Sequence, residues 1–338
     1  MERVAGDGQV TQSSGGQRVL VVGGAGYLGT VLTGQLLDEG HRVQVLDTLR
    51  FGDHHLSGLQ ARDGFSLVRG DMRNIDVVSA CVKDADAVIL LGSLVGEPAC
   101  DLNPKETVDI NLIATKAVAE ACRYYEVPRF IFASTDSVYG IQEGKMYEDS
   151  SKNPISLYGR LKVKAEEEIM ALSGGSFQPT IMRMATIYGL SPRMRFDLVV
   201  NALTLNAVLH GKITVYGGAQ WRPFVHVADA AQAYVRCLRA PLADVGGQAF
   251  NVGSNDQNYQ IGQLAEIIRQ VFPKVVVQVV PQSPDLRDYY VCCDKITKVL
   301  GYRARRAVVD GVKEIKATIE SGAIGNPAEP RYYNVPRK

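Results

Sequence analysis

Arg18-Val-Leu-Val-Val-Gly-Gly-Ala-Gly-Tyr-Leu-Gly29 is a short apolar run that ends in a glycine-rich turn. The apolar residues are typical of a buried parallel strand, and a helical pattern follows as far as Asp38. Glycines let a backbone turn tightly and approach a pyrophosphate, and the helix N-terminus offers it free N–H groups. Two spacings fit, Gly24-x-Gly26-x-x-Gly29 and Gly23-x-x-Gly26-x-x-Gly29. The stretch predicts a dinucleotide-binding strand–turn–helix unit.

A second apolar strand, residues 41–47, ends in an acidic residue. Asp47 follows Gly29 by 18 residues, which is near the place where an acid binds the adenosine ribose hydroxyls. A carboxylate there repels a 2′-phosphate, and Thr48 and Leu49 supply no cation, although Arg50 is close. We therefore expect NAD(H) rather than NADP(H). The alternative is that Asp47 is an ordinary residue at the end of a strand.

Short apolar strands alternate with helical stretches through the first half of the chain. This alternation predicts an α/β fold, a Rossmann doubly wound parallel sheet covered on both faces, with a smaller C-terminal α/β substrate-binding domain. After Tyr188-Gly189 the alternation stops, and the second domain is expected to close over the carboxyl ends of the strands. The expected parts are a disordered leader (1–17), an NAD-binding domain (18–190, with 225–255 returning to it) and a substrate-binding domain (191–224 and 256–338).

The strands and helices are expected at particular positions. The expected strands are residues 18–23, 42–47, 65–69, 87–91, 129–134, 179–184, 213–216 and 249–252. The expected helices are residues 26–38, 73–82, 105–126, 157–173, 195–210, 260–271 and 308–322, with a strand end running into a helix over 225–239.

Composition excludes several classes of protein. The 338 residues carry a formal net charge of +1, which argues against a general nucleic-acid or membrane-surface role. The sequence contains no uninterrupted stretch of eighteen apolar residues, so we expect no membrane-spanning helix. The six cysteines show no C-x-x-C spacing, which fits a reducing cytoplasm, and the five histidines show no paired ligand spacing, so we expect no metal.

Tyr158 and Lys162 are four residues apart, so on a helix they project from one face. A free tyrosine titrates near pH ~10, and burial raises its pKa further. A usable phenolate base therefore needs positive charge, which Lys162 and an oxidised nicotinamide would supply. The hydroxyl of Thr135 could share the proton. Together these groups are suited to oxidising an alcohol to a ketone and reducing it back. In isolation, the Tyr/Lys spacing is more often that of a surface pair on a helix.

Several ordered motifs between about residues 18 and 320 resemble one family. They are the glycine turn, Gly70-Asp-Met-Arg73, Ser134-Thr-Asp-Ser-Val-Tyr-Gly140, Tyr158-x-x-x-Lys162 and Arg222-Pro-Phe-Val-His-Val-Ala-Asp229. Asn251-Val-Gly253 and the stretch from Arg287 to Gly301 add to them. The chain resembles an extended short-chain dehydrogenase/reductase of the nucleotide-sugar epimerase and dehydratase subgroup, similar to UDP-galactose 4-epimerases.

The resemblance implies roles for individual residues. The implied catalytic residues are Tyr158, Lys162, Thr135 and Asp136. The implied NAD-binding residues are Gly23, Gly26, Tyr27, Leu28, Gly29, Asp47, Asp71, Met72, Leu91, Gly92, Ser93, Asn111, Tyr158 and Lys162. The implied residues for a nucleotide-diphosphate sugar are Thr135, Asp136, Ser137, Thr186, Arg222 and Arg287, the two arginines binding the diphosphate through paired N–H groups.

Three positions depart from the family pattern. Dehydratases of the family have Glu where Ser137 stands, so the pair of carboxylates that elimination of water needs is incomplete here. Many members have Asn at the position of Thr186, and Leu91-Gly-Ser-Leu replaces a common His-Leu-Ala-Ala. Asp136 could tune the hydroxyl chemistry, recognise a substituent or be a polar loop residue, and Trp221 could cover the nucleotide or only pack.

These features predict an NAD-dependent nucleotide-sugar epimerase that acts at C4 through a transient 4-keto sugar. The first alternative is an NAD(P)H-dependent 4-ketoreductase, followed by a uronic-acid sugar-nucleotide decarboxylase or a dehydratase. A sensor that keeps the fold without catalysis is a further alternative. The resemblance also implies a homodimer through helices 105–126 and 157–173. The tail around Pro330 could line the pocket or pack as a strap.

Overall fold

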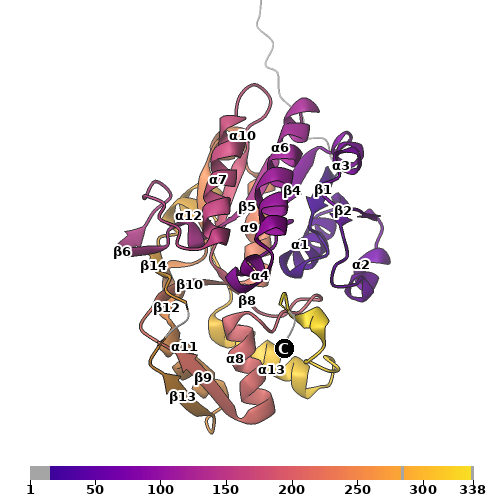
Figure 1. The fold of residues 1–338 in the computed structure, drawn as a ribbon. Coiled ribbons are helices and arrows are strands. Elements are labelled where there is room, and N and C mark those ends of the chain that lie inside the picture. The colour runs from indigo at the N-terminus through magenta and orange to yellow at the C-terminus, as the bar shows by residue number, and fades with distance from the viewer. Residues whose placement is uncertain (1–15, 283–284, 336–338) are drawn as a thin grey trace, which may run out of the picture.

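A seven-stranded parallel sheet forms the centre of the protein (Figure 1). The computed structural model describes residues 16–282 and 285–335, so the predicted leader lies almost entirely outside the described residues. Across the sheet the strand order is β3-β2-β1-β4-β5-β7-β11. Its strands are β1 (Arg18–Val22), β2 (Arg42–Asp47), β3 (Phe65–Arg69), β4 (Ala87–Leu90), β5 (Phe130–Thr135), β7 (Thr180–Met184) and β11 (Ala249–Val252).

Helices cover both faces of this sheet. On one face α1 (Tyr27–Asp38) packs against α9 (Val227–Arg239), and α12 (Asp294–Leu300) contacts α9 and β11. On the other face lie α3 (Ile75–Val82), α6 (Thr115–Tyr124) and α7 (Leu157–Ala171). Strands buried between two helical layers need apolar residues throughout, and all four residues of β4 are buried. The predicted doubly wound α/β fold is confirmed.

The chain leaves the sheet after β7 and later returns to it. Following α9, β11 pairs in parallel with β7, with Ala249 opposite Ile181. Residues 249–252 therefore belong to the same sheet as the glycine turn, although more than 200 positions separate them along the chain.

A smaller unit lies at the carboxyl ends of the sheet strands, and Figure 1 shows α8, α11, α13, β9 and β13 gathered at that end. Its apolar core comes mainly from three helices and the strands between them. Its elements are β8 (Thr186–Tyr188), α8 (Val199–His210), β9 (Lys212–Tyr216), β10 (Trp221–His226), β12 (Asn258–Gln260), α11 (Ile261–Val271), β13 (Val276–Val280) and α13 (Val308–Glu320). The helix expected from residue 195 begins at Val199.

The remaining elements are short. Two of them, β6 (Ile141–Met146) and β14 (Asp288–Val291), pair with each other in parallel. The others are η1 (His54–Leu56), α2 (Ser57–Gln60), α4 (Glu97–Leu102), α5 (Pro104–Val108), η2 (Asp109–Ala114), η3 (Asp136–Val138), α10 (Leu242–Val245), η4 (Asn255–Gln257) and η5 (Pro330–Tyr332). The single helix expected over 105–126 is interrupted, because η2 is a π-helical segment. Within the described residues, no helix has the length and apolar character needed to span a membrane.

Candidate active site

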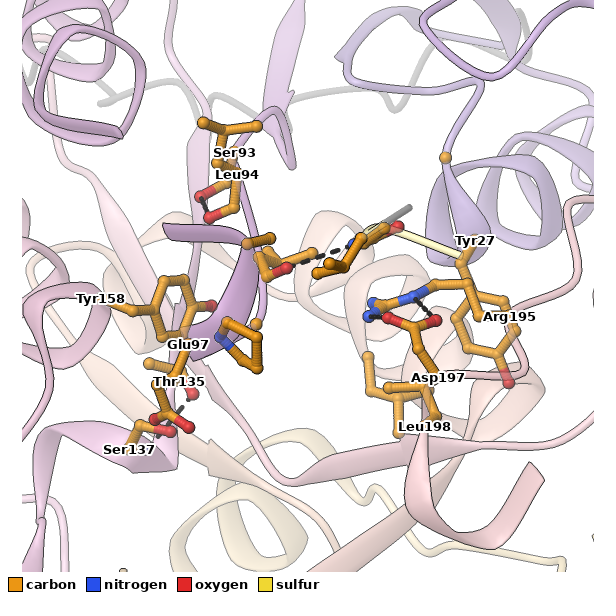
Figure 2. Close-up of a pocket in the computed structure, with 18 of the residues that line it drawn as sticks. Tyr27, Ser93, Leu94, Glu97, Thr135, Ser137, Tyr158, Arg195, Asp197 and Leu198 are labelled. Carbon is orange, nitrogen blue, oxygen red and sulfur yellow. Dashed lines mark hydrogen bonds and ion pairs between the residues drawn. The ribbon is translucent and has the colours of Figure 1, made fainter. Parts of the chain in front are cut away.

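A cleft of about 1780 Å³ runs along the carboxyl ends of the strands, between the sheet and the smaller unit. The glycine turn, Asp47, Thr135, Tyr158 and Arg222 all line it. Figure 2 shows Tyr158, Thr135, Ser137 and Glu97 together on one side of the cleft, with Tyr27, Arg195 and Asp197 on the other. One continuous cavity therefore brings the predicted cofactor and substrate residues together, except Asn111 and Asp136, which do not line it.

The glycine turn joins β1 to α1 and has the geometry that a pyrophosphate requires. Gly23 has a φ of +83°, and a Cβ atom on it would lie 2.5 Å from the backbone nitrogen of Gly92. A Cβ on Gly29 would lie 2.6 Å from the carbonyl oxygen of Gly23, so that position also has no room for a side chain. Gly26 begins α1 without a side-chain cap. The turn thus presents backbone and the positive end of the helix to the cleft, as an anion site does.

Asp47 lies at the end of β2, beside that turn. Its Oδ2 accepts a hydrogen bond from Ala25 N at 3.0 Å, and its Oδ1 accepts one from Leu49 N at 2.8 Å. Burial raises the pKa of this carboxyl, while the backbone N–H groups act in the opposite direction. The nearby Arg50 is half exposed and lies 3.4 Å from Glu106 Oε1. This arrangement suits ribose hydroxyls. Arg50, the cation closest in sequence that could bind a 2′-phosphate, is already paired with Glu106.

The next strand ends supply the walls of the cleft. Asp71 and Met72 line it, and the Asp71 carboxylate accepts hydrogen bonds from the side chain of Arg73. Leu91, Gly92 and Ser93 follow β4 and also line it. These contacts place five of the predicted cofactor residues along one wall.

Asn111 supports that wall from behind and does not line the cleft itself. Its Oδ1 accepts hydrogen bonds from Ser93 Oγ at 2.9 Å and from Leu94 N at 2.8 Å, and its Nδ2 donates to Leu94 O at 2.8 Å. The side chain is fully buried, in the π-helical segment η2. Asn111 therefore acts on the cleft through the position of residues 93–94.

Tyr158 lies in the first turn of α7, and Ser156 caps this helix by accepting a hydrogen bond from Gly159 N. The phenol shares a hydrogen bond with Thr135. Burial raises the pKa of Tyr158, and the nearby Cys100 acts in the same direction, whereas the Thr135 hydrogen bond lowers it. Among the chain's own groups burial therefore dominates, and the phenol keeps its proton at neutral pH.

Lys162 lies one helical turn after Tyr158 and is only 2% exposed. Its Nζ donates to Ala133 O at 2.8 Å and lies 4.5 Å from the centroid of the Phe132 ring. Burial lowers the pKa of Lys162 to about 7. The Nζ is 5.9 Å from the centroid of the Tyr158 ring, so the two residues are near each other without a hydrogen bond between them. The sequence predicts that Lys162 and an oxidised nicotinamide together outweigh burial at the phenol, and the groups of the chain supply only the first of these two charges.

A buried ion pair holds α7 against the sheet. Arg183 of β7 donates to both oxygens of Glu166, from Nε at 3.0 Å and from Nη2 at 2.9 Å. Ser134 Oγ and Lys152 Nζ donate to the same carboxylate. Burial alone would raise the pKa of Glu166, but Arg183 holds it below its usual range. This network fixes the helix that carries Tyr158 and Lys162 relative to the strand end that carries Thr135.

Two arginines meet at the far end of the cleft from the glycine turn. The Arg287 Nη1 donates to Ser137 Oγ at 2.9 Å and lies 3.0 Å from Glu97 Oε1. Asp285 joins the two arginines, because its carboxylate lies 2.6 Å from Arg287 Nη2 and 2.9 Å from Arg222 Nη2. Arg222 also donates to the backbone oxygens of Trp221 and Arg287. Thr186 lines the cleft at the start of β8.

Asp136 and Trp221, like Asn111, do not line the cleft. Asp136 is 1% exposed and does not line the cavity, and neither oxygen of its carboxyl has a hydrogen-bond partner. Burial raises its pKa well above the ordinary value. The Trp221 ring packs against Tyr290, with 5.5 Å between the ring centroids, and also lies outside the cleft lining.

Two residues of the cleft, Glu97 and Arg193, were not among those that the sequence predicted. Glu97 of α4 is a half-buried carboxyl beside Tyr158 and Thr135, and burial raises its pKa (Figure 2). Arg193 reaches the cleft from the loop after β8. Tyr333, Asn334 and Val335 of the tail line the cleft as well, which is one of the two alternatives that the sequence left open. Pro98 is a local signal for the start of α4. No local pattern in the sequence predicts that Glu97, Arg193 and the tail meet at one cleft.

The comparisons with known proteins agree with this geometry. A UDP-glucose 4-epimerase from Cyamopsis tetragonoloba is 26% identical over 330 residues, which cover 88% of this chain and 93% of that protein. A dTDP-glucose 4,6-dehydratase from Streptomyces niveus is 28% identical over 313 residues, covering 88% and 91%. The solved structure of MoeE5 in complex with UDP-glucuronic acid and NAD superimposes with a TM-score of 0.77 at 27% identity, covering 90% of this chain and 99% of that one.

The cofactor follows from the turn and from the family. The space at Gly23 and Gly29, the uncapped start of α1 and the position of Asp47 all fit NAD. Among the described residues, no group of three or more His, Cys, Asp or Glu side chains could hold a metal ion. The model of the NAD dependent epimerase/dehydratase family matches residues 19–253. The chain therefore belongs to the NAD-dependent epimerase/dehydratase family, and its cofactor is NAD.

Proposed function

We propose that the protein is a nucleotide-sugar epimerase that acts at C4 through a transient 4-keto sugar. One observation carries the proposal: the hydrogen-bonded pair of Tyr158 and Thr135 lies in the same cleft as the glycine turn, with a hydroxyl, Ser137, at the position where a dehydratase has its glutamate. An epimerase needs to move one proton and one hydride, and it needs no base for elimination.

NAD, when bound, would accept the hydride from the sugar carbon and return it. Tyr158 takes the proton of the C4 hydroxyl and gives it back, and Thr135 shares that proton through the hydrogen bond between them. Lys162, with a pKa of about 7, can hold a positive charge behind this pair near neutral pH. The raised pKa of Tyr158 means that ligands must supply additional stabilisation of the phenolate.

Arg222 and Arg287 would hold the diphosphate while the sugar presents its other face. Burial alone would raise the pKa of Asp285, but the two arginines keep it well below the ordinary value. A diphosphate would take over the guanidinium contacts that Asp285 makes, because phosphate and carboxylate oxygens both accept paired hydrogen bonds from the planar guanidinium of arginine. With the diphosphate anchored, the sugar is free to rotate and present its other face, as epimerisation requires.

One observation favours a second candidate, elimination of water from the 4-keto sugar. Elimination needs a carboxylate base, and Glu97 lies in the sugar side of the cleft with a raised pKa (Figure 2). Its contact with Arg287 at 3.0 Å argues for a binding role instead, and it comes from a different element than the family's glutamate would.

A panel of UDP-, GDP-, CDP- and dTDP-sugars, with product identification by NMR, tests the proposal. Inversion at C4 with no net change in NADH supports it. Stoichiometric loss of NADH with a keto sugar would mean a ketoreductase, and a 4-keto-6-deoxy product would mean a dehydratase. Binding of NAD and sugar nucleotides without any turnover would leave a non-catalytic protein.

The proposal includes a homodimer in the cytoplasm. Ile113 and Tyr124 expose apolar surface on the helices that the family resemblance assigns to the dimer interface, at 59% and 80%. All six cysteines are free, as in a reducing compartment. Light scattering of the purified protein tests the dimer: the mass of one chain, 36.8 kDa, would refute it.

A further inference from the structure

Arg193 is a buried guanidinium that lacks an acidic partner. It is 4% exposed, and its Nη2 donates to the amide oxygen of Asn334 at 2.9 Å. Its Nε is buried without a hydrogen-bond partner. Among residues 16–282 and 285–335, no carboxylate lies within 4.0 Å of its nitrogens, whereas Arg195 on the same loop pairs with Asp197 at 2.6 Å.

An unpaired charge in such a place costs stability. Burying a cation without an anion is unfavourable, even after the surroundings relax. The cost appears in the pKa of Arg193, which burial lowers to about 10. Its cation–π contact with the Phe51 ring, at 3.8 Å from the ring centroid, recovers only part of it. Proteins keep groups of this kind where a ligand supplies the missing partner.

The surroundings of Arg193 belong to the dinucleotide half of the cleft. Phe51 follows Asp47 by four residues, and the charge of Arg193 is felt by Asp47 and Tyr27, which lie at the end of β2 and at the start of α1. Its neighbours Arg195 and Asp197 lie across the cleft from Tyr158 and Ser137 in Figure 2. The nearest anion that a bound dinucleotide brings to the start of α1 is its pyrophosphate.

The C-terminal tail sets the position of the guanidinium. Asn334 accepts from Arg193 and donates its Nδ2 to Val95 O at 3.2 Å, so it joins the loop after β8 to the loop after β4. Phe196 N donates to Tyr332 O at 2.9 Å, which ties the tail to the same loop. The side chain of Arg193 is therefore held in place from both sides of the cleft.

We propose that Arg193 binds the pyrophosphate of NAD from the substrate-domain side of the cleft, and that Asn334 positions it. The glycine turn would then bind the pyrophosphate from one side and the guanidinium from the other. The substrate domain and the tail would take part in holding the cofactor, which is independent of the reaction proposed above.

Binding measurements on the full-length chain, freed of nucleotide, test this directly. Affinities of NAD, ADP, adenosine and UDP are compared by calorimetry or by displacement of a fluorescent NAD analogue. Removing one charged hydrogen-bonding partner predicts that Arg193→Gln weakens NAD and ADP about ten- to hundred-fold. Adenosine, which has no phosphate, and UDP should bind as in the wild type. Arg195→Gln is the matched control and should change NAD affinity less than about threefold, because Asp197 already neutralises that charge.

Two further readouts separate a binding role from a structural one. Without nucleotide, Arg193→Gln should unfold at the same or a higher temperature than the wild type, because an unpaired buried charge is removed. Asn334→Ala should weaken NAD by a smaller factor. Unchanged NAD affinity in Arg193→Gln would overturn the proposal, as would an equal loss for adenosine. A loss confined to UDP would assign the guanidinium to the substrate instead.

Discussion

Replacing Lys162 by Met should change how the stability of the protein depends on pH. Burial lowers the pKa of this lysine from 10.5 to about 7, a difference of about 3.5 units. At about 1.4 kcal/mol per unit, protonated Lys162 costs the folded state on the order of 5 kcal/mol. Met has a similar length and no charge, but it leaves Ala133 O without its partner, at about 1–3 kcal/mol.

The sign of the effect follows from proton binding. Below pH 7 the lysine is protonated in both the folded and the unfolded chain, so the cost is fully present. Between pH 7 and 10.5 the unfolded chain binds more protons than the folded one, so wild-type stability rises with pH. We expect Lys162→Met to be about 2–4 kcal/mol more stable than the wild type at pH 6. The wild type should gain about 3 kcal/mol relative to the variant between pH 7 and 9.5.

Urea denaturation of nucleotide-free protein at several pH values measures this difference. Lys164→Met, two residues along the same helix, is the control, because Lys164 is exposed and its pKa is raised by hydrogen bonds with Glu167 and Glu168. The control should follow the wild type closely. Parallel pH profiles for Lys162→Met and the wild type would show that the lysine is not desolvated as the structure has it.

Three other substitutions give distinct outcomes. Tyr158→Phe should abolish turnover, by about a thousandfold or more given the usual contribution of a general acid–base group, while NAD titration and thermal unfolding remain as in the wild type. Asp136→Asn should keep kcat/KM within about twofold, because the carboxyl is buried, has no hydrogen-bond partner and lies outside the cleft; a hundredfold loss in a stably folded variant would return Asp136 to the mechanism. Asn111→Ala should lower the free energy of unfolding by about 2–4 kcal/mol in urea and weaken NAD, since Leu94 loses partners for both its N–H and its carbonyl; unchanged values of both would contradict the supporting role.

The first half of the fold could be predicted from the sequence because its signals are local. Buried parallel strands such as β1 and β4 are continuous apolar runs, and the glycine turn between β1 and α1 is a short contiguous motif. The strand β6 carries no such signal, since only Ile141 and Met146 in it are apolar. The valine-rich strand β13 does carry one, and it is missing from the strands expected above. The π-helical segment η2 also has no local pattern, because Asn111 is held there by the loop at residues 93–94.

The site was predictable where its chemistry depends on spacing. Tyr158 and Lys162 meet Thr135 in the cleft because a helix fixes their separation and the strand end faces them. The direction in which Asp136 points depends on the turn η3, and the contact of Arg193 with Asn334 joins residues 141 positions apart. The pKa of the Tyr158 phenol also depends on its burial, which the spacing of residues in the sequence does not reveal. The type of reaction could be predicted from the sequence, but only tertiary contacts show which charged groups lack partners.

The central claim is that Tyr158 moves the C4 hydroxyl proton while the hydrogen on C4 leaves and returns within one active site. The most direct measurement uses the sugar nucleotide turned over in the panel, labelled with deuterium at C4, and follows the product by NMR and mass spectrometry. We predict an inverted C4 that retains its deuterium, with no label released to solvent and no product from Tyr158→Phe. Deuterium lost to water, or the same rate without the phenol, would contradict the account.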